Sequence, residues 1–163
     1  MDFVSPSLGK VTLREVLLDM MHFVKVDPHA SYQVVVGTDS QTNASSTQFV
    51  TAIVIRRIGK GAKFYYQRRR TRPIYSLRQR IYTETEWSLN LAMEMQELMA
   101  ADGLDDTWEL EVHIDVGQEG ESRKLIQEVV GWVTAVGYTA RIKPQAYGAS
   151  TVADRLSKTQ MLG

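Results

Sequence analysis

Two aspartates each follow a run of residues that favour strands. Asp39 follows three valines in VVVGTDSQTN, and Asp115 ends the alternating segment TWELEVHID. If these segments are parallel neighbouring strands, their carboxyl ends share one edge of the sheet and the two carboxylates converge there. Two like charges brought together repel each other, and a bound cation is the usual compensation. The pattern therefore predicts a metal site, and the absence of cysteine leaves oxygen or imidazole as its ligands.

Two further acids can reach the same edge. Glu84 begins the apolar stripe of a predicted helix, sharing its face with Ser88, Leu91, Met95 and Leu98. Glu86 lies about 200° round that helix, on what we take as the solvated face, and is the alternate to Glu84. Asp154 begins a predicted last helix in GASTVADRLSK, and a short helix beside the first strand would bring it near Asp39.

Hydrophobic periodicity and turn residues indicate the elements that position these acids. A capping-box pattern formed by Thr12 and Glu15 starts the first helix, and Gly59-Lys60-Gly61 separates two strands of a hairpin. We expect helices over Thr12–Val24, Thr83–Ala101, Ser122–Val136 and from Thr151, and strands over Tyr32–Thr38, Thr47–Arg57, Ala62–Arg70, Thr107–Asp115 and Tyr138–Pro144. After the N-terminal helix the order is βββαβαβα. It predicts an α/β fold with a five-stranded mixed sheet flanked by helices, and one extra N-terminal helix.

Length and composition limit the class of protein. A chain of 163 residues with 44% hydrophobic residues can bury one core, so we expect a single domain over 1–163 with a helical extension over 1–30. There is no apolar run of about 18 residues, and MDFVSPSLGK lacks the features of a secretion signal. We therefore expect a soluble, cytoplasmic protein with no membrane partner. The sequence leaves the oligomeric state open.

The charges are unevenly distributed although the net charge is zero. Ten of the nineteen Lys and Arg residues lie between Arg56 and Arg80, and no Asp or Glu interrupts them. Aromatic residues are interleaved with these cations, namely Phe64, Tyr65, Tyr66 and Tyr75. Cations that contact phosphates and rings that stack on bases or sugars are typical of nucleic-acid binding. The residues we expect to contact nucleic acid are Arg68, Arg69, Arg70, Arg72, Arg78, Arg80 and Tyr66.

The order of the elements and the positions of the four acids resemble the ribonuclease H fold. More narrowly, the segments GTDSQ, RIYTETEWSL and HIDVG resemble a bacterial ribonuclease H-like family of unknown function, the YkuK type. The resemblance spans nearly the whole chain. Carried over residue by residue, it implies that Asp39, Glu84, Asp115 and Asp154 are both the catalytic and the metal-binding acids.

The resemblance also implies a mechanism. Two Mg²⁺ or Mn²⁺ ions, bridged by Asp39 and roughly 3.5–4 Å apart, would activate a water and stabilise the leaving oxygen of a phosphodiester. The substrate would be RNA, DNA or an RNA/DNA hybrid. The expected function is thus a divalent-metal-dependent nuclease.

Other interpretations stay open at this point. Each acid alone has a structural explanation, because Asp39 can begin an Asx turn and Glu84 or Asp154 can be a favourable acid in a first helical turn. The same fold can also carry a nucleic-acid-binding module without catalysis. A third alternative is a protein-interaction scaffold whose Arg-rich hairpin docks an acidic partner.

Overall fold

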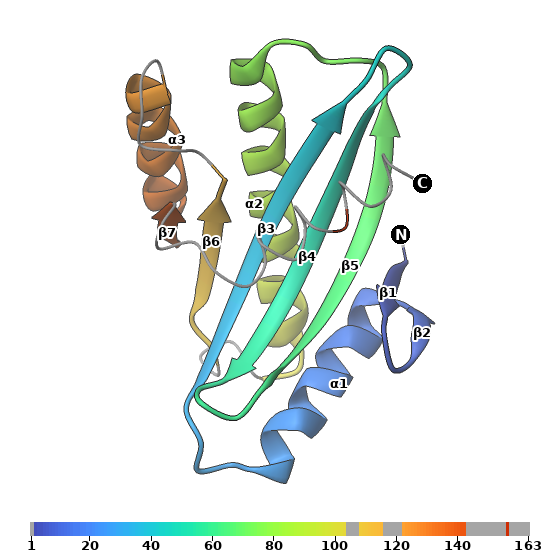
Figure 1. Ribbon diagram of the computed structural model, residues 1–163. Coiled ribbons are helices and arrows are strands. Elements are labelled where there is room, and N and C mark those ends of the chain that lie inside the picture. The colour runs from blue at the N-terminus through green and yellow to red at the C-terminus, as the bar shows by residue number, and fades with distance from the viewer. Residues whose placement is uncertain (1, 104–107, 116–121, 143–155, 157–163) are drawn as a thin grey trace.

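The computed structural model describes residues 2–103, 108–115, 122–142 and 156 of the chain. The elements are β1 (Phe3–Ser5), β2 (Gly9–Val11), α1 (Leu13–Val26), β3 (Tyr32–Thr42), β4 (Thr47–Arg57), β5 (Ala62–Thr71), α2 (Leu77–Ala101), β6 (Leu110–Ile114), α3 (Ser122–Val136) and β7 (Thr139–Ile142) (Figure 1). Thr12 caps α1 and exchanges hydrogen bonds with Glu15, which confirms the predicted capping box.

The strands form one mixed sheet in the order β2-β1-β5-β4-β3-β6-β7. The β3–β6 and β6–β7 pairs are parallel and the other pairs are antiparallel. The described part of the chain forms seven strands in this sheet, so the prediction of five was wrong. The two extra strands, β1 and β2, have three residues each, and so short a segment cannot show the alternation by which strands are recognised in a sequence.

The helix order also differs from the prediction. The first helix follows the β1–β2 hairpin, so the N-terminal extension is not helix alone, and the described order is ββαβββαβαβ. The predicted last helix from Thr151 lies outside the described residues except for Leu156. This residue is helical and packs against the sheet.

Strands β3 and β4 are buried on both faces, which explains their continuous apolar runs. Helices α1, α2 and α3 cover one face, here called the helix face, where Val34, Val36 and Ile53 join the main core (Figure 1). Residues of opposite parity form a smaller cluster on the other face, here called the second face. Its members are Val35, Val50, Ala52 and Val54, with Phe64, Tyr66 and Leu156 packed against them.

Two boundaries differ from the prediction in ways that change the candidate site. Strand β3 continues to Thr42 instead of ending at Thr38, so Asp39 lies inside a strand, where it pairs with Val50. Helix α2 begins at Leu77 with Ser76 as its cap, so Glu84 lies two turns inside the helix. The Asx-turn explanation of Asp39 and the first-turn explanation of Glu84 are therefore both wrong.

A partly buried ion pair attaches α1 to the sheet. The hydroxyl of Tyr65, a fully buried residue of β5, donates a 2.6 Å hydrogen bond to Asp19 Oδ2, and Lys63 Nζ lies 2.7 Å from the same oxygen. Burial alone would raise the pKa of Asp19, but the hydrogen bonds from Lys63 and Tyr65 outweigh it and hold this pKa below its ordinary value of 3.8. The ionised carboxylate therefore stabilises the fold.

We predict that Tyr65→Phe lowers the free energy of unfolding by about 1.5–3 kcal/mol, because a partly buried hydrogen bond to a charged group is lost. The measurement is urea unfolding at neutral pH. The difference should shrink as the pH falls through the folded pKa of Asp19, because protonation removes the charge that the hydroxyl stabilises. Tyr75→Phe is the matched control, since Tyr75 is 72% exposed and its hydroxyl lies in solvent. An equal loss in both variants would contradict the prediction.

Candidate active site

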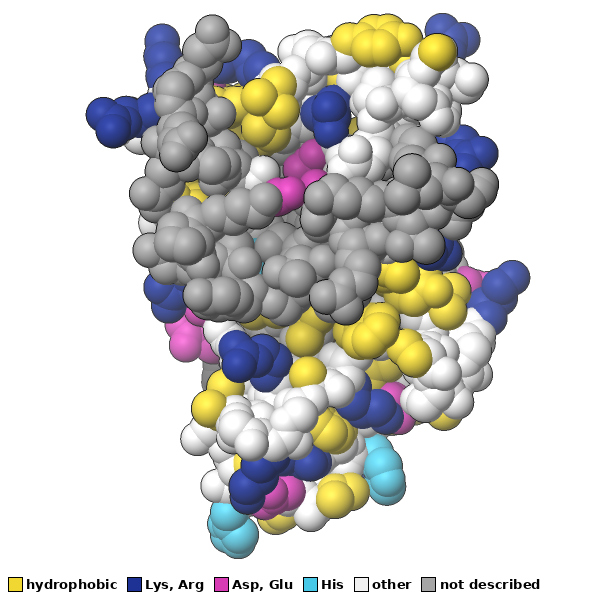
Figure 2. All heavy atoms as spheres, viewed as in Figure 1, with side chains coloured by type: hydrophobic (Ala, Val, Ile, Leu, Met, Phe, Trp, Pro, Cys, Tyr) yellow, Lys and Arg dark blue, Asp and Glu magenta, His cyan; other side chains and the backbone are white. Residues whose placement is uncertain are grey.

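Within the described residues, the difference in length between β3 and β6 leaves a notch in the sheet. Strand β6 pairs with β3 only between Val34 and Gly37, whereas β3 continues for five more residues to Thr42. Asp39 lies in this part of β3, and Asp115 directly follows the end of β6. Figure 2 shows acidic side chains at the surface in the upper half of the view, where β3 and β6 end in Figure 1, with Lys and Arg side chains around them.

Carboxylates from the two faces of the sheet meet at this notch. Asp39 is buried and, by the alternation of β3, lies on the second face with its partner Val50. Glu84 is also buried, and it comes from α2 on the helix face. A complete β6 would separate the two faces at this level. The notch removes that barrier.

The pKa of Glu84 records how closely the acids are grouped. Burial is the largest cause that raises this pKa well above its ordinary value of 4.5, and the charges of Asp39 and Asp115 raise it further. A hydrogen bond from Ser40 and the charge of Arg80 act in the opposite direction. Three of the four predicted acids therefore interact electrostatically at one place.

Ser40 and Arg80 hold the Glu84 carboxylate in position. The Ser40 hydroxyl donates to Glu84 Oε2 and accepts from Arg80 Nε at 3.0 Å. Arg80 Nη2 also donates to the Ser40 carbonyl at 2.8 Å. The structure thus places Arg80, which the sequence assigned to nucleic acid, beside the carboxylates. Ser40 was missed, although it is the residue after Asp39 and so faces the helices.

A second polar contact joins α2 to β3 one turn further along the helix. The Thr38 hydroxyl lies 2.7 Å from the Ser88 hydroxyl and 3.0 Å from that of Thr51 on β4. All three residues are buried. The sequence analysis placed Ser88 on the core-facing stripe but did not assign it a partner. These hydroxyls keep α2 in register with the strand that carries Asp39.

The remaining predicted acids are placed as follows. Asp115 is half-buried and lines a small hollow together with Glu84 and His113. Glu86, the alternate to Glu84, is exposed on the other side of α2. Asp154 lies outside the described residues. Within the described ranges, no group of three or more His, Cys, Asp or Glu side chains converges closely enough to hold a metal ion as it stands.

The arginines of β5 that we expected to contact nucleic acid lie on both faces of the sheet. The strand register places Arg68 level with Asp39, and Arg70 level with Gln41, all on the second face. Arg69 lies on the helix face, with its guanidinium 5.0 Å from the Trp87 ring centroid.

Among the others, Arg72 and Arg78 are exposed, whereas Tyr66 is half-buried in the cluster of the second face. The guanidinium of Arg68 lies 4.8 Å from the centroid of the Tyr66 ring. Tyr66 therefore supports an arginine and offers little free surface of its own.

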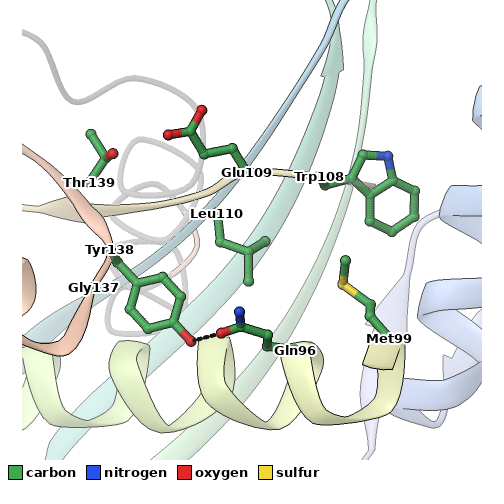
Figure 3. A pocket seen from close by; sticks show the side chains of 8 residues that line it. All are labelled: Gln96, Met99, Trp108, Glu109, Leu110, Gly137, Tyr138 and Thr139. Carbon is green, nitrogen blue, oxygen red and sulfur yellow. Dashed lines mark hydrogen bonds between the residues drawn. The ribbon is translucent and has the colours of Figure 1, made fainter. Parts of the chain in front are cut away.

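A separate pocket opens at the opposite end of the sheet. Its volume is about 280 Å³, and the hydroxyl of Tyr138 donates to Gln96 Oε1 at 2.6 Å across its wall (Figure 3). Trp108 and Glu109 enter it from the segment that leads into β6, whereas Asp115 follows the other end of that strand. This pocket is therefore distinct from the carboxylate notch.

Comparison with known proteins identifies the class. The Ribonuclease H-like family model matches residues 15–158, and the chain belongs to this family. The uncharacterized protein YkuK of Bacillus subtilis (strain 168) is 37% identical over 168 residues, covering 96% of this chain and 96% of the relative. Both findings confirm the resemblance inferred from GTDSQ, RIYTETEWSL and HIDVG. No solved structure matches the chain, and no described helix is long and apolar enough to cross a membrane.

We predict that Asp39→Asn raises the free energy of unfolding by about 1 kcal/mol in the presence of EDTA, because a negative charge that disfavours the ionised form of buried Glu84 is removed. For a chain of this size the melting temperature should rise by roughly 2–4 °C. Thermal unfolding followed by circular dichroism measures it. Glu86→Gln is the control, since the same change of charge at an exposed position of α2 should leave the melting temperature unchanged. A lower melting temperature for Asp39→Asn would show that the carboxylate stabilises the fold.

Proposed function

We propose that this protein is a divalent-metal-dependent nuclease that hydrolyses phosphodiester bonds in nucleic acid. The observation that carries the proposal is the burial of Glu84 beside Asp39 and Asp115 at the notch. Asp39 and Asp115 act on Glu84 with charges of the same sign, against which the charge of Arg80 acts. A bound cation would reduce this repulsion further, and the ribonuclease H-like family membership supports such a role.

The donor set fits a hard divalent cation. Carboxylate oxygens are the ligands that Mg²⁺ and Mn²⁺ favour. Asp39, Glu84 and Asp115 would hold the ions, with Asp154 as the proposed fourth ligand. When bound, such ions lower the pKa of water and stabilise charge on a phosphodiester. Because the described side chains do not yet form a three-ligand cluster, ion binding would have to draw them together.

The chain's own residues supply orientation. Ser40, which is itself held by Arg80, orients the Glu84 carboxylate. Arg68 and Arg70 lie on the same face as Asp39, two strands away, which corresponds to about 10 Å across the sheet. A nucleic-acid strand crossing β4 and β5 on this face would place one phosphate at the notch and others at the arginines.

We predict that the purified protein cleaves at least one member of a panel of labelled RNA, DNA, hybrid and branched substrates when Mg²⁺ or Mn²⁺ is present. Chelation should abolish cleavage. Asp39→Asn should lower the rate by a factor of about 10² or more while the circular dichroism spectrum stays unchanged, since typical catalytic groups contribute this much. Glu86→Gln should cleave at the wild-type rate. Equal cleavage by wild type and Asp39→Asn would refute the carboxylate site.

We also predict that the arginines differ in their contribution to binding. Replacing both Arg68 and Arg70 by Ala should reduce the slope of log affinity against log salt by roughly 1.5, because two phosphate contacts are lost. Arg69→Ala, with the same change of charge on the other face of the same strand, should leave the slope nearly unchanged. Titration of a labelled oligonucleotide by fluorescence anisotropy at several salt concentrations measures both. Equal slopes for all variants would show that Arg68 and Arg70 do not contact the phosphates of the bound strand.

Binding without cleavage in these experiments would favour the non-catalytic nucleic-acid-binding module. Absence of both binding and cleavage would favour the protein-interaction scaffold. The two experiments together therefore separate the three alternatives that the sequence left open.

A further inference from the structure

The four aromatic residues of the basic stretch have different surroundings. Tyr65 is fully buried, and Phe64 and Tyr66 pack against the cluster of the second face. Tyr75 is 72% exposed, which is the largest exposed fraction among the large hydrophobic side chains that the described residues leave at the surface. Of the four rings, Tyr75 is therefore the one that is open to a ligand.

The backbone next to this exposed ring is fixed. The Ile74 amide donates to Thr47 Oγ1 at 2.7 Å, and the Ile74 carbonyl accepts from Thr42 Oγ1 at 3.0 Å. On the other side, Ser76 caps α2 by accepting from the Gln79 amide at 3.2 Å. Tyr75 is thus held between two anchored neighbours. A ring on a fixed backbone loses less conformational entropy on binding than a ring on a mobile loop.

Tyr75 lies on the same rim of the sheet as the carboxylate notch. Thr42, which binds the Ile74 carbonyl, is three residues beyond Asp39 on β3, a separation of about 10 Å along the strand. Ser76, the residue after Tyr75, lines an open hollow of about 510 Å³ with Arg78, Gln79 and Tyr82. The position can therefore reach the same substrate strand as the acids.

The charge around the ring suits a polyanion. Arg72 and Arg78 are exposed near Tyr75 in the sequence, and the guanidinium of Arg78 lies 5.2 Å from the Tyr82 ring centroid while it pairs with Glu128. An exposed aromatic ring among cations is the combination that holds unpaired bases and their phosphates. The bases of a continuous duplex are much less available to such a ring, because they are already stacked on one another.

We propose that Tyr75 stacks on an unpaired base of the substrate strand beside the carboxylates. The preferred substrate is then nucleic acid with single-stranded character at the cleaved region, rather than a continuous duplex. This inference rests on the proposed nuclease function and specifies its substrate class.

The test compares the affinities of the full-length wild type, Tyr75→Ala and Tyr75→Phe for one oligonucleotide as a single strand and as a duplex. Fluorescence anisotropy is measured in EDTA so that the substrates stay intact. Tyr75→Ala should bind the single strand at least about fivefold more weakly, whereas Tyr75→Phe should bind as the wild type, because stacking needs the ring and not the hydroxyl. Affinity for the duplex should change less than about twofold.

A second readout reports stacking directly. A 2-aminopurine base placed at successive positions of the single strand should lose fluorescence at one position on binding to wild type and Tyr75→Phe, but not to Tyr75→Ala. Leu18→Ala is the matched control, since Leu18 is a 54% exposed apolar residue on α1. It should behave as the wild type in both measurements.

The outcomes separate this inference from the function on which it rests. If the wild type binds and cleaves single strands and Tyr75→Ala does so equally well, the stacking role is wrong and the nuclease proposal stands. If the wild type neither binds nor cleaves any nucleic acid, both fail together. A change of oligomeric state in Tyr75→Ala, with nucleic-acid binding unchanged, would assign the ring to contact with a second copy of the chain and overturn the inference.

Discussion

The contacts around the notch depend on one constraint, which is the burial of the Glu84 carboxylate next to Asp39 and Asp115. Removing a charged carboxylate from water is costly, and two like charges nearby increase the cost. Ser40 offsets part of it through a direct hydrogen bond to Glu84, and Arg80, which donates to Ser40, offsets a further part through its charge. The rest must come from packing that keeps α2 on the sheet despite this repulsion.

That packing is provided on the same helix. Ser88 is bonded to Thr38 one turn beyond Glu84, and further along α2 the fully buried side chains of Ala92 and Met95 enter the main core. The contacts of these residues bind α2 to the sheet that carries Asp39. An unfavourable group of acids is thus held in place by favourable apolar burial elsewhere in the fold, as is common at functional sites.

The notch has a simple origin in strand length. Strand β3 has 11 residues and β6 has 5, so the parallel pair ends while β3 is still extending along β4. Because successive side chains of a strand alternate between faces, Ser40 points to the helices while Asp39 points to the second face. Adjacent residues of β3 therefore supply the Asp39 carboxylate on one face and, on the other face, the Ser40 hydroxyl that bonds to Glu84.

The sequence predicted much of this arrangement because most elements carry strong periodic or capping signals. The hairpin, the crossover helices and the position of Asp115 directly after β6 follow from local patterns, whereas Asp39 lies inside β3 and not at its end. The two three-residue strands could not be predicted, because pairing with β5 rather than their own sequence defines β1 and β2.

The early start of α2 was missed for a related reason. LRQR has no apolar stripe, and Ser76 is a cap that can be recognised only when the helix after it is known. The roles of Ser40 and Arg80 depend on contacts between residues 40 positions apart in the chain. No local pattern in a single sequence records such a contact.

The net charge is zero, but positive and negative side chains are separated in the proposed site. The arginines of β5 form one part of it and the carboxylates at the notch form the other. Arg68 is level with Asp39 and lies about 10 Å from it across the sheet, which is close to one Debye length at physiological ionic strength, so Arg68 and its neighbour Arg70 weaken the field of the acids and the acids weaken theirs. In the proposed function, phosphates bound to the arginines would remove that compensation and place a polyanion beside the carboxylates, which would raise the affinity of the acids for a divalent cation. By thermodynamic linkage, a bound cation would then strengthen nucleic-acid binding by the same factor.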